Sequence, residues 1–536
     1  MKDPQAWLEM RKYTPAMLAT ARTVLGEVMS GTPVMTAVRR NPLPGGGHVA
    51  KHALVALYHR MVMDGEMEEN PELLSLIRMK PMRTLSGVTT VTVLTKPYPC
   101  PGDCIFCPTD ARMPKSYLPD EPGAARAFQN EFDPYRQVSS RLEAYEAVGH
   151  PTDKIELLIL GGTWSFYQHD YQAWFVQRCL DAMNGHDSAS LEDAQHHNED
   201  SAHRNVGLVI ETRPDRIDAD ELAWLRRLGV TKVQLGVQSL NDEILLRNRR
   251  GHTSARALNA CALLRAAGFK IVLHWMPNLL GATPETDRAD FARLWDETPA
   301  GAGFCPDEIK IYPTQLLETA ELYRYWQRGE YQPYSTETLI DMIADLKPTI
   351  PEYCRVNRII RDIPSEHVVA GNRRTSLRMD VMAELERRGQ VCRCVRCREV
   401  RGGQVIRKDL KLTNLVYHPA HAEEHFLSFI TPDDHIAGYL RLSLPGAAAP
   451  NLGFSDLSGA ALVREVHVYG QALPVGGGQE GAAQHIGLGT CLLQEAARIA
   501  SAAGFRRLAV ISAIGTRRYY AARGFNQGEL YMVQEL

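Results

Sequence analysis

Three cysteines stand close together in the stretch Pro99-Cys100-Pro-Gly-Asp-Cys104-Ile-Phe-Cys107-Pro108. Their spacing, C-x3-C-x2-C, suits three corners of a [4Fe–4S] cluster and leaves the fourth iron open. A closed structural zinc site needs four protein ligands, and the next cysteine along the chain is Cys179. The loop therefore favours an iron–sulfur cluster with one vacant iron, and zinc with a distant fourth ligand is the alternative.

The sequence around this loop alternates short apolar runs with amphipathic segments from about residue 80 to 345. Strands are expected at 89–94, 154–160, 206–211, 232–236, 270–276 and 308–312. Strands that alternate with helices predict an α/β fold, with a parallel sheet and helices outside it. Six strands favour a partial (β/α) barrel over the full barrel of eight. The cysteine loop follows the first strand, at the carboxyl end where such folds carry their sites.

Two other regions flank this barrel. Residues 1–75 are expected to be helical, because 16–29 and 49–63 show apolar recurrence at helical spacing. Residues 403–536 have a mixed α+β pattern, with strands expected at 405–412, 435–444, 461–469 and 507–512 and helices at 491–502 and near 517–523. The predicted domains are 1–75, 76–347, a Cys- and Arg-rich connection at 348–402, and 403–536. Residues 185–205 are expected to form a surface insertion.

The composition is that of a soluble globular protein, with 44% hydrophobic and 23% charged residues. No apolar run approaches the roughly 20 residues of a membrane span, and the first residues lack the apolar core of a signal peptide. We therefore expect a cytoplasmic protein without membrane contact, whose eleven cysteines bind metal rather than form disulfides. The net charge of -3 excludes capture of nucleic acid by the whole protein, although residues 1–60 and 371–401 are locally basic. Solvated charged faces are the alternative for these two segments.

Polar residues end three more of the expected strands, at the same edge of the sheet as the cysteine loop. The stretch Gly161-Gly162-Thr163 has a bare backbone that can approach a polar ligand closely. The third and fourth strands end with Glu211, Arg213, Gln234 and Gln238. Each motif alone has a simpler structural explanation, as a turn, a surface ion pair or exposed amides.

Taken together, these motifs resemble the radical S-adenosylmethionine (SAM) superfamily. The resemblance implies that Cys100, Cys104 and Cys107 hold the cluster and that the strand-end residues bind SAM. It also implies that the cluster gives one electron to SAM, which yields a 5′-deoxyadenosyl radical.

The C-terminal part carries Gln484-His-Ile-Gly487-Leu488-Gly489-Thr490 ahead of an expected helix. A Gly-rich turn that opens a helix offers free N–H groups and a positive dipole end to an anion such as a pyrophosphate. The pattern resembles the coenzyme A signature of GNAT-type acetyltransferases, and a generic turn is the alternative. The preceding strand would splay open to receive the pantetheine arm of acetyl-CoA, and Tyr519 and Tyr520 would meet the thioester sulfur. The strand residues concerned are Glu465, Val466, His467 and Val468.

A second group of cysteines, Cys392, Cys394 and Cys397, has the spacing C-x-C-x2-C. One interpretation is a structural Zn2+ site that is completed by Cys305, Cys354 or a histidine. Free thiols and a second iron–sulfur cluster are the alternatives. The interleaved arginines would make this segment a basic surface between the two domains.

The order of the two domains, together with eight short motifs, resembles the catalytic subunit of Elongator, in a prokaryotic form. The resemblance covers residues from about 80 to 536 and is weaker before them. The motifs begin at Arg83, Gly161, Glu211, Arg250, Ile311, Arg361, Arg398 and Glu465.

This family resemblance implies modification of the wobble uridine of tRNA, position 34, to 5-carboxymethyluridine. Acetyl-CoA would be the substrate that supplies the carbon atoms, and thioester hydrolysis would release coenzyme A. The resemblance further implies that Lys154 contacts acetyl-CoA from the barrel side, with Lys310 as a second candidate in that cleft. A surface lysine is the alternative for Lys154.

The expected partners are the anticodon stem-loop of tRNA and an external electron donor, and a homodimer is left open. The basic segments 1–75 and 373–401 would hold tRNA through its phosphates. Two other functions stay open at this point: a protein lysine acetyltransferase with a structural iron–sulfur cluster, and a non-catalytic RNA-binding protein.

Overall fold

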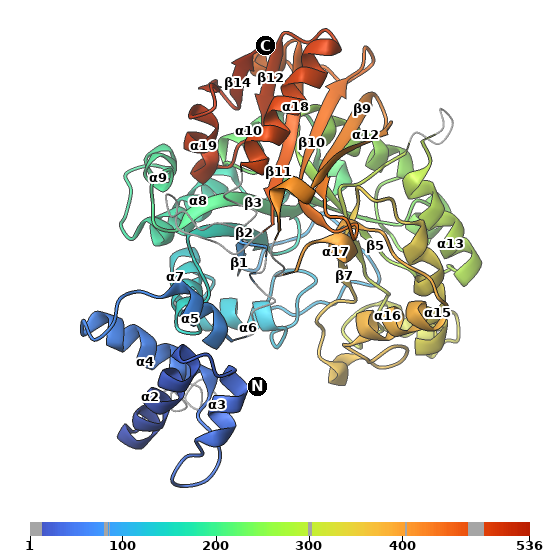
Figure 1. Ribbon diagram of the computed structural model, residues 1–536. Coiled ribbons are helices and arrows are strands. Elements are labelled where there is room, and N and C mark those ends of the chain that lie inside the picture. Colours follow the sequence, from blue (N-terminus) through green and yellow to red (C-terminus); the bar gives the residue numbers. More distant parts are fainter. Residues whose placement is uncertain (1–12, 80–83, 85, 298–302, 402–404, 470–486) are drawn as a thin grey trace.

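The computed structural model describes residues 13–79, 84, 86–297, 303–401, 405–469 and 487–536 (Figure 1). Two seven-stranded sheets organise these residues, one built from residues 89–359 and the other from residues 411–535. No helix within the described ranges has both the length and the apolar character that a membrane span requires.

The first sheet is parallel throughout, and its strands lie side by side in chain order. Its strands are β1 (Thr89–Leu94), β2 (Lys154–Leu160), β3 (Arg204–Thr212), β4 (Lys232–Gln238), β5 (Lys270–Trp275), β6 (Glu308–Ile311) and β7 (Arg355–Ile359). β1 and β7 form its two edges, so the barrel is partial, as predicted.

All six expected strands form, but the expected number is wrong because β7 adds a seventh. β7 lies beyond residue 347, where the connection between domains was expected to begin. Its sequence Arg-Val-Asn-Arg-Ile does not show the apolar run of a buried strand. Only Val356 and Ile359 are apolar and buried, and the residues between them are polar.

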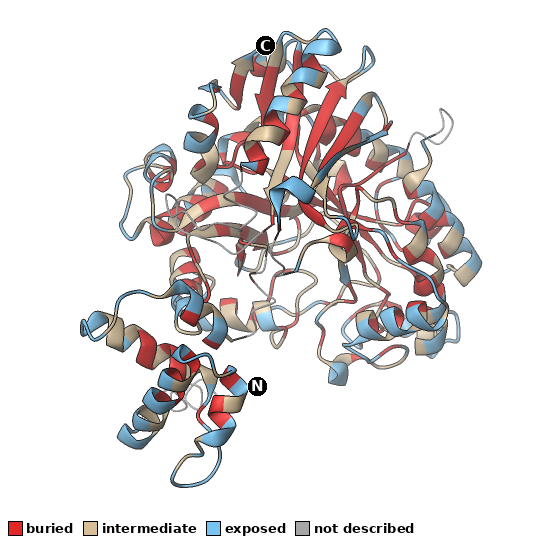
Figure 2. Ribbon diagram, viewed as in Figure 1, coloured by how far each residue is buried: buried red, intermediate tan, exposed pale blue. Residues whose placement is uncertain are grey.

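Helices cover the outer face of this sheet, and the apolar faces of strands and helices form one large core. Figure 2 shows the strands mostly buried and the outward faces of the helices exposed. The helices that contribute to this core are α7 (Pro134–Glu146), α8 (His169–Asn184), α9 (Leu191–Asn198), α10 (Ala219–Arg227), α12 (Ser254–Ala266), α13 (Pro284–Ala292), α15 (Thr336–Leu346), α16 (Leu377–Arg387) and α17 (Val395–Arg398). Three further helices, α6 (Pro122–Gln129), α11 (Asp242–Arg247) and α14 (Leu322–Gln327), lie outside this cluster.

The second sheet has the order β13-β14-β12-β11-β10-β9-β8, and only its β11–β12 pair is parallel. Its strands are β8 (Lys411–Tyr417), β9 (Ala422–Ile430), β10 (Ile436–Pro445), β11 (Ala460–Val468), β12 (Arg507–Val510), β13 (Asn526–Gln527) and β14 (Met532–Glu535), and its helices are α18 (Leu488–Ala502) and α19 (Arg517–Ala521). The strand expected at 405–412 is wrong, because a 3-10 turn at Arg407–Asp409 precedes β8. β9 escaped prediction because it carries a fully buried Glu424.

The N-terminal residues are helical, as predicted, and the helices α2 (Pro15–Met29) and α4 (Lys51–Met63) correspond to the two expected segments. α3 (Val34–Arg40) and α5 (Pro71–Ile77) complete this unit. These four helices share a hydrophobic core of their own and lie to one side of the barrel (Figure 1).

The second sheet docks at the amino ends of the parallel strands, opposite the cysteine loop. Arg464 of β11 donates to the carbonyl oxygen of Phe269, the residue before β5, at 3.0 Å. Arg441 of β10 donates to the carbonyl oxygen of Tyr353, close to the start of β7, at 2.7 Å. Both arginines also pair with Asp307, the residue before β6. The carboxyl ends of the strands therefore carry the cysteine loop, and their amino ends contact the second sheet.

The segment 185–205 is more than a surface insertion. It contains α9, whose Ala194 and Asn198 are fully buried. Glu199 pairs with Arg517 of α19 at 3.0 Å, so the segment links the barrel to the second sheet. The expected insertion thus also contributes a contact between the barrel and the second sheet.

Candidate active site

One cavity of about 860 Å³ runs through the partial barrel and reaches the second sheet. Its lining contains every second residue of several strands, because alternate side chains of a barrel strand point inward. The lining includes Thr90, Thr92 and Leu94 of β1, Glu156, Leu158 and Leu160 of β2, and Val209 and Glu211 of β3. Cys107 lies at the carboxyl end of this cavity, and Glu465, His467 and Tyr520 of the C-terminal part also line it.

The cysteine loop lies where the sequence placed it, directly after β1. Two guanidinium groups approach the Cys104 sulfur: Nη1 of Arg250 at 3.3 Å and Nη1 of Arg213 at 4.0 Å. The Cys100 sulfur lies 3.4 Å from the backbone nitrogen of Gly102. Burial raises the pKa of the Cys107 thiol to about 11, so this thiol becomes a ligand only when a metal displaces its proton.

These contacts fit a ligand set for an anionic iron–sulfur cluster, because cations and N–H groups stabilise thiolates and the sulfide cage they hold. The close approach of Arg213 to the loop requires glycine at position 102. A Cβ at Gly102 would lie 2.1 Å from Nη1 of Arg213, so glycine lets the guanidinium reach the loop.

The second motif, Gly161-Gly162-Thr163, lies beside the same loop, and the Thr163 hydroxyl is 3.6 Å from the Cys100 sulfur. Gly161 and Gly162 have positive φ angles of 135° and 90°. A Cβ at Gly161 would meet the Thr95 hydroxyl at 1.8 Å, which makes glycine obligatory there for packing alone.

The polar residues that end β3 and β4 do not all face the same space. Glu211, Gln234 and Gln238 line the cavity. Arg213 does not line it and instead pairs with Asp215 at 2.9 Å and contacts Cys104. Gln238 has a positive φ of 74°, and its buried Oε1 has no hydrogen-bond partner in the described part of the chain.

The two candidate lysines have different surroundings. Lys310 of β6 lines the cavity and donates to Oε1 of Gln234. Lys154, the first residue of β2, pairs in the ladder with Arg204 and is not among the cavity residues. Burial lowers the pKa of Lys154.

Alternating charges line the amino end of the cavity, and sequence reasoning missed them. Lys232 pairs with Glu156 at 2.5 Å and with Glu308 at 3.7 Å. Lys270 pairs with Glu308 at 2.5 Å and also with Glu465 of β11. A charged residue at the first position of an otherwise apolar strand is the signal that could have identified Lys232, Lys270 and Glu308.

The helix α18 begins at the predicted Gly-rich turn, but residues 484–486 of that turn lie outside the described residues. Gly487 has a positive φ of 73° and precedes Leu488 at the start of the helix. The Tyr519 hydroxyl lies 2.4 Å from where a Cβ of Gly489 would stand. Arg523 stacks on the Tyr519 ring at 3.5 Å and donates to the Thr490 hydroxyl at 3.0 Å, so Tyr519 and Arg523 pack beside the first turn of α18.

The expected splay of β11 is present in the strand ladder. β11 pairs with β12 only from Ala460 to Val463, whereas it pairs with β10 as far as Val468. The backbone of residues 464–468 is therefore not paired with β12. Tyr520, which is buried, lines the cavity beside this opening.

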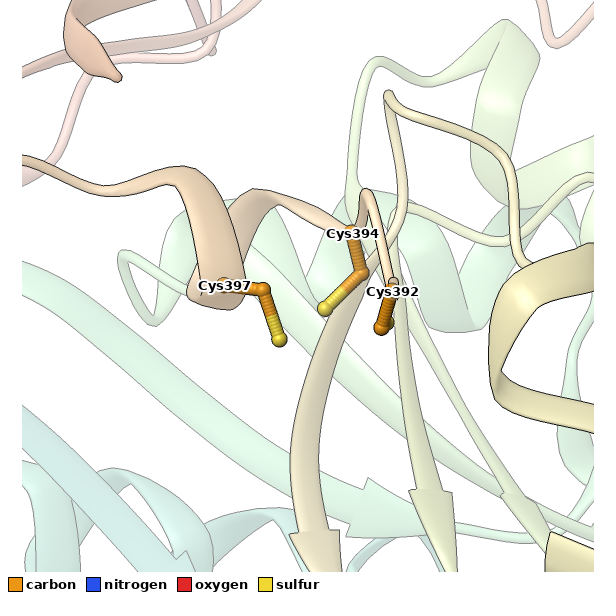
Figure 3. Close-up of side chains that lie close together, drawn as sticks. All are labelled: Cys392, Cys394 and Cys397. Carbon is orange, nitrogen blue, oxygen red and sulfur yellow. The ribbon is translucent and has the colours of Figure 1, made fainter. Parts of the chain in front are cut away.

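The second cysteine group does converge (Figure 3). The sulfurs of Cys392, Cys394 and Cys397 lie within 4.8 Å of one another, and no other group of this kind occurs in the part of the chain that the structure describes. Thiolates on one zinc ion lie roughly 3.8 Å apart, since each Zn–S bond is about 2.3 Å. Hydrogen bonds from Cys392 and Cys397 hold the pKa of Cys394 well below its usual range.

This difference in spacing separates the two triads. Each cysteine of a [4Fe–4S] site binds a different iron atom, so its sulfurs stay farther apart than those on one ion. The sulfurs of Cys100, Cys104 and Cys107 are not gathered within 4.8 Å, whereas those of the second triad are. A single-ion site therefore fits the second triad better than the first.

Some arginines of segment 373–401 are engaged in ion pairs with acidic residues from other segments. Arg388 pairs with Asp341 and Asp345, and Arg398 with Glu352 and Asp434. These contacts neutralise part of the positive charge of the segment. Spacing along the sequence gave no sign of the acidic partners, which come from α15, from the segment between α15 and β7, and from the turn before β10.

Comparisons with known proteins agree with this arrangement. Residues 98–293 match the family described as the radical SAM superfamily, and residues 306–387 match the radical SAM C-terminal domain. The chain is 44% identical over 459 residues to a tRNA uridine(34) acetyltransferase of Dehalococcoides mccartyi, which covers 85% of this chain and 99% of that protein. It is 36% identical to Elongator complex protein 3 of Danio rerio, over 86% of each chain. The solved structure of archaeal Methanocaldococcus infernus Elp3 with an N-terminal deletion aligns with a TM-score of 0.73 at 37% identity, over 84% of this chain and 100% of that one.

Proposed function

The chain belongs to the family of tRNA uridine(34) acetyltransferases and Elongator complex protein 3, and we propose that it modifies uridine 34 of tRNA with the two carbon atoms of an acetyl group. The proposed product is 5-carboxymethyluridine, formed with acetyl-CoA and SAM. The names of the relatives give an acetyltransferase that acts on uridine 34, and the carboxymethyl group on the base is our proposal.

The observation that carries this proposal is the continuous cavity. It is lined at one end by Cys107 of the cluster loop and at the other by Glu465, His467 and Tyr520. A reaction that begins at the cluster and acts on a thioester needs one enclosed space between the two, since water would intercept a reactive intermediate. A protein lysine acetyltransferase would not need a cavity that reaches the cluster loop.

The residues at the carboxyl end would hold the cluster and SAM. Cys100, Cys104 and Cys107 supply three thiolates, and Arg213 and Arg250 place positive charge beside Cys104. When bound, the cluster supplies one electron that cleaves SAM and thereby provides the radical chemistry of the reaction. The proposed SAM contacts are Gly161, Gly162, Thr163, Glu211, Arg213, Gln234 and Gln238. An external electron donor would supply the electron to the cluster.

The residues at the amino end would hold acetyl-CoA. The start of α18, at Gly487–Thr490, presents backbone N–H groups that suit a pyrophosphate. The side of β11 that β12 leaves uncovered, at residues 465–467, would bind the pantetheine arm by main-chain hydrogen bonds. Tyr520 would then face the thioester within the cavity, and Lys310 would lie nearer the base.

The tRNA would reach this cavity with its wobble base turned out of the anticodon loop. Arg39 and Arg40 are exposed at the end of α3 and could contact phosphates. Arg22 and Arg60 of neighbouring helices are already paired with Glu66 and Asp64. We therefore propose α3 as the main phosphate contact of the N-terminal unit.

Anaerobic reconstitution with iron, sulfide, a reductant, SAM, acetyl-CoA and tRNA tests the proposed function. We expect 5′-deoxyadenosine and free coenzyme A in equal amounts, and uridine 34 that is heavier by a carboxymethyl group. Mass spectrometry of the digested tRNA distinguishes this product from an acetyl adduct, which contains one oxygen atom less. Uridine 34 of unchanged mass, with acetylated lysines on added protein, would favour the lysine acetyltransferase instead.

We also propose that Cys392, Cys394 and Cys397 supply three of the four ligands of a structural Zn2+. Replacing Cys397 with serine should remove the ion, because loss of a ligand costs more than the roughly 10–100-fold in affinity that loss of a supporting hydrogen bond costs. Metal analysis should find about one zinc per wild-type chain and less than a tenth of that in the variant. Cys179→Ala, in a buried position on α8, is the matched control and should keep its zinc. Equal zinc in both variants would contradict the assignment.

A further inference from the structure

One side chain in the cavity has a role that the proposed function leaves open. His467 and Glu465 lie two residues apart on β11, so both point from the same face of the strand into the cavity. They lie in the part of β11 that has no ladder with β12. This is the opening where the pantetheine arm is proposed to enter, so its acyl end would meet these side chains first.

Glu465 and His467 differ in how far their hydrogen-bonding atoms already have partners. Glu465 is fully engaged: it accepts from the Tyr439 hydroxyl at 2.8 Å and from Arg441 at 2.9 Å, and it pairs with Lys270. The Nε2 atom of His467 is buried and has no hydrogen-bond partner among the residues that the structure describes. A buried polar atom without a partner is costly, so such atoms often mark a place where a ligand binds.

The imidazole ring of His467 is held in a fixed orientation. It stacks on the Tyr439 ring with centroids 5.7 Å apart and meets the edge of Tyr469 at 4.5 Å. A donor that is already oriented loses little entropy when a ligand arrives. The ring is thus prepared to make one directed hydrogen bond from Nε2.

The ring is also uncharged at neutral pH. Burial lowers the pKa of His467 to about 4, and the nearby Lys270 and Arg355 lower it too, while Glu465 and Glu156 act in the opposite direction. A neutral imidazole carries one N–H and one lone pair. So weak a base is poorly suited to take a proton from water, but a neutral N–H suits an oxygen that gains negative charge.

We propose that His467 donates a hydrogen bond from Nε2 to the carbonyl oxygen of the acyl thioester in this cavity, an inference that rests on the proposed function. The thioester has one strong acceptor, its carbonyl oxygen, and His467 lies at the end of the opening where that oxygen would arrive. This assigns the proton of the neutral ring to Nε2.

The same hydrogen bond would assist release of coenzyme A. A water oxygen bonds to the carbonyl carbon, and the π electron pair moves to the carbonyl oxygen, where His467 stabilises the charge. The pair then returns, the C–S bond breaks, and the sulfur leaves with its electrons. The thiolate takes up the proton that the water lost, so one water yields one carboxylic acid and one thiol without any change of oxidation state.

Calorimetric titration of the full chain with acetyl-CoA and, separately, with CoA tests the proposal. CoA lacks the carbonyl group but keeps every other contact. In His467→Phe we expect acetyl-CoA affinity to fall about 5-fold, the usual worth of one hydrogen bond, and CoA affinity to change by less than about 2-fold. His467→Gln keeps an N–H near the same place and should recover most of the acetyl-CoA affinity.

A second readout is the rate of tRNA-dependent coenzyme A release at saturating acetyl-CoA. His467→Phe should lower this rate about 100-fold, as loss of one donor to a developing oxyanion does, and His467→Gln should restore part of it. His425→Phe is the matched control, because His425 is buried in the same sheet but lies outside the cavity. It should leave both the affinity ratio and the rate unchanged.

The possible outcomes separate this inference from the function on which it rests. Equal loss of CoA and acetyl-CoA affinity in His467→Phe would mean a structural role and would overturn the inference alone. A glutamine variant no better than the phenylalanine variant would also overturn it. Failure of the wild-type chain to bind either ligand would overturn the proposed function, and this inference with it.

Discussion

Replacing Cys104 with serine is expected to abolish SAM cleavage and tRNA modification together. Serine is a poor ligand for iron, and Cys104 is the thiol that Arg250 and Arg213 approach at 3.3 and 4.0 Å. With only two thiolates left, the loop would lose the cluster, and with it the chemistry that the protein itself cannot supply. We expect iron and sulfide content to fall to background and no 5′-deoxyadenosine to form.

The control for this variant must remove a thiol without touching the loop. Cys261→Ala removes a buried thiol from α12 and should keep both the iron content and the activity of the wild-type chain. Binding of CoA to Cys104→Ser should be unchanged, because the start of α18 belongs to the C-terminal part of the chain and not to the cysteine loop. A Cys104→Ser protein that retained iron and produced 5′-deoxyadenosine would exclude the loop as the cluster site.

Arg250→Met tests the guanidinium beside the cysteine loop without changing any of the three cysteines. It leaves three thiolates but removes the guanidinium at 3.3 Å from Cys104. The cluster should still assemble, since the ligands that bind iron are intact. Comparing this variant with Cys104→Ser therefore shows whether loss of iron follows the thiol itself or any disturbance of the loop.

Local chemistry explains what could be predicted from the sequence. The cysteine spacing identifies its site because ligand geometry depends on a few neighbouring residues, and β1 to β6 are visible as apolar runs of strand length. β7 was missed because its inward residues, Arg355 and Asn357, are charged or polar and line a cavity rather than a packed core. A barrel with a hollow, polar interior thus removes the very signal by which buried strands are found.

Contacts between distant segments explain what could not be predicted. Glu424 is fully buried, which no pattern within β9 indicates, because its partners Arg464 and Arg265 come from β11 and α12. The charges at the amino ends of β4 to β6 make sense only once β11 is placed beside them. In the same way, the acidic partners of Arg388 and Arg398 become visible only in the folded chain.

Replacing Asp307 with asparagine should produce the largest loss of stability. Asp307 is fully buried between the barrel and the second sheet, where Arg464 contacts both its oxygens at 2.6 and 2.8 Å. Its Oδ2 also accepts the backbone N–H of Ile271 at 2.8 Å. The neutral amide would leave Arg464 and Arg441 short of negative charge in a dry interface, which costs about 3–5 kcal/mol. Urea unfolding followed by circular dichroism should show the first transition at a lower midpoint.

The pH dependence and a matched control make this prediction specific. Burial by itself would raise the pKa of Asp307, but Arg464 and Arg441 outweigh it and hold the pKa below its ordinary value. The carboxylate therefore stabilises the fold fully above its unfolded pKa of about 3.9 and loses this effect as pH falls below it. The deficit of Asp307→Asn should be constant between pH 5 and 8 and shrink in acid.

Asp200→Asn also breaks a pair between the two domains, with Arg518, but both side chains are more than half exposed, so its deficit should stay below about 1 kcal/mol. Equal deficits would mean that burial does not give the Asp307 network its strength.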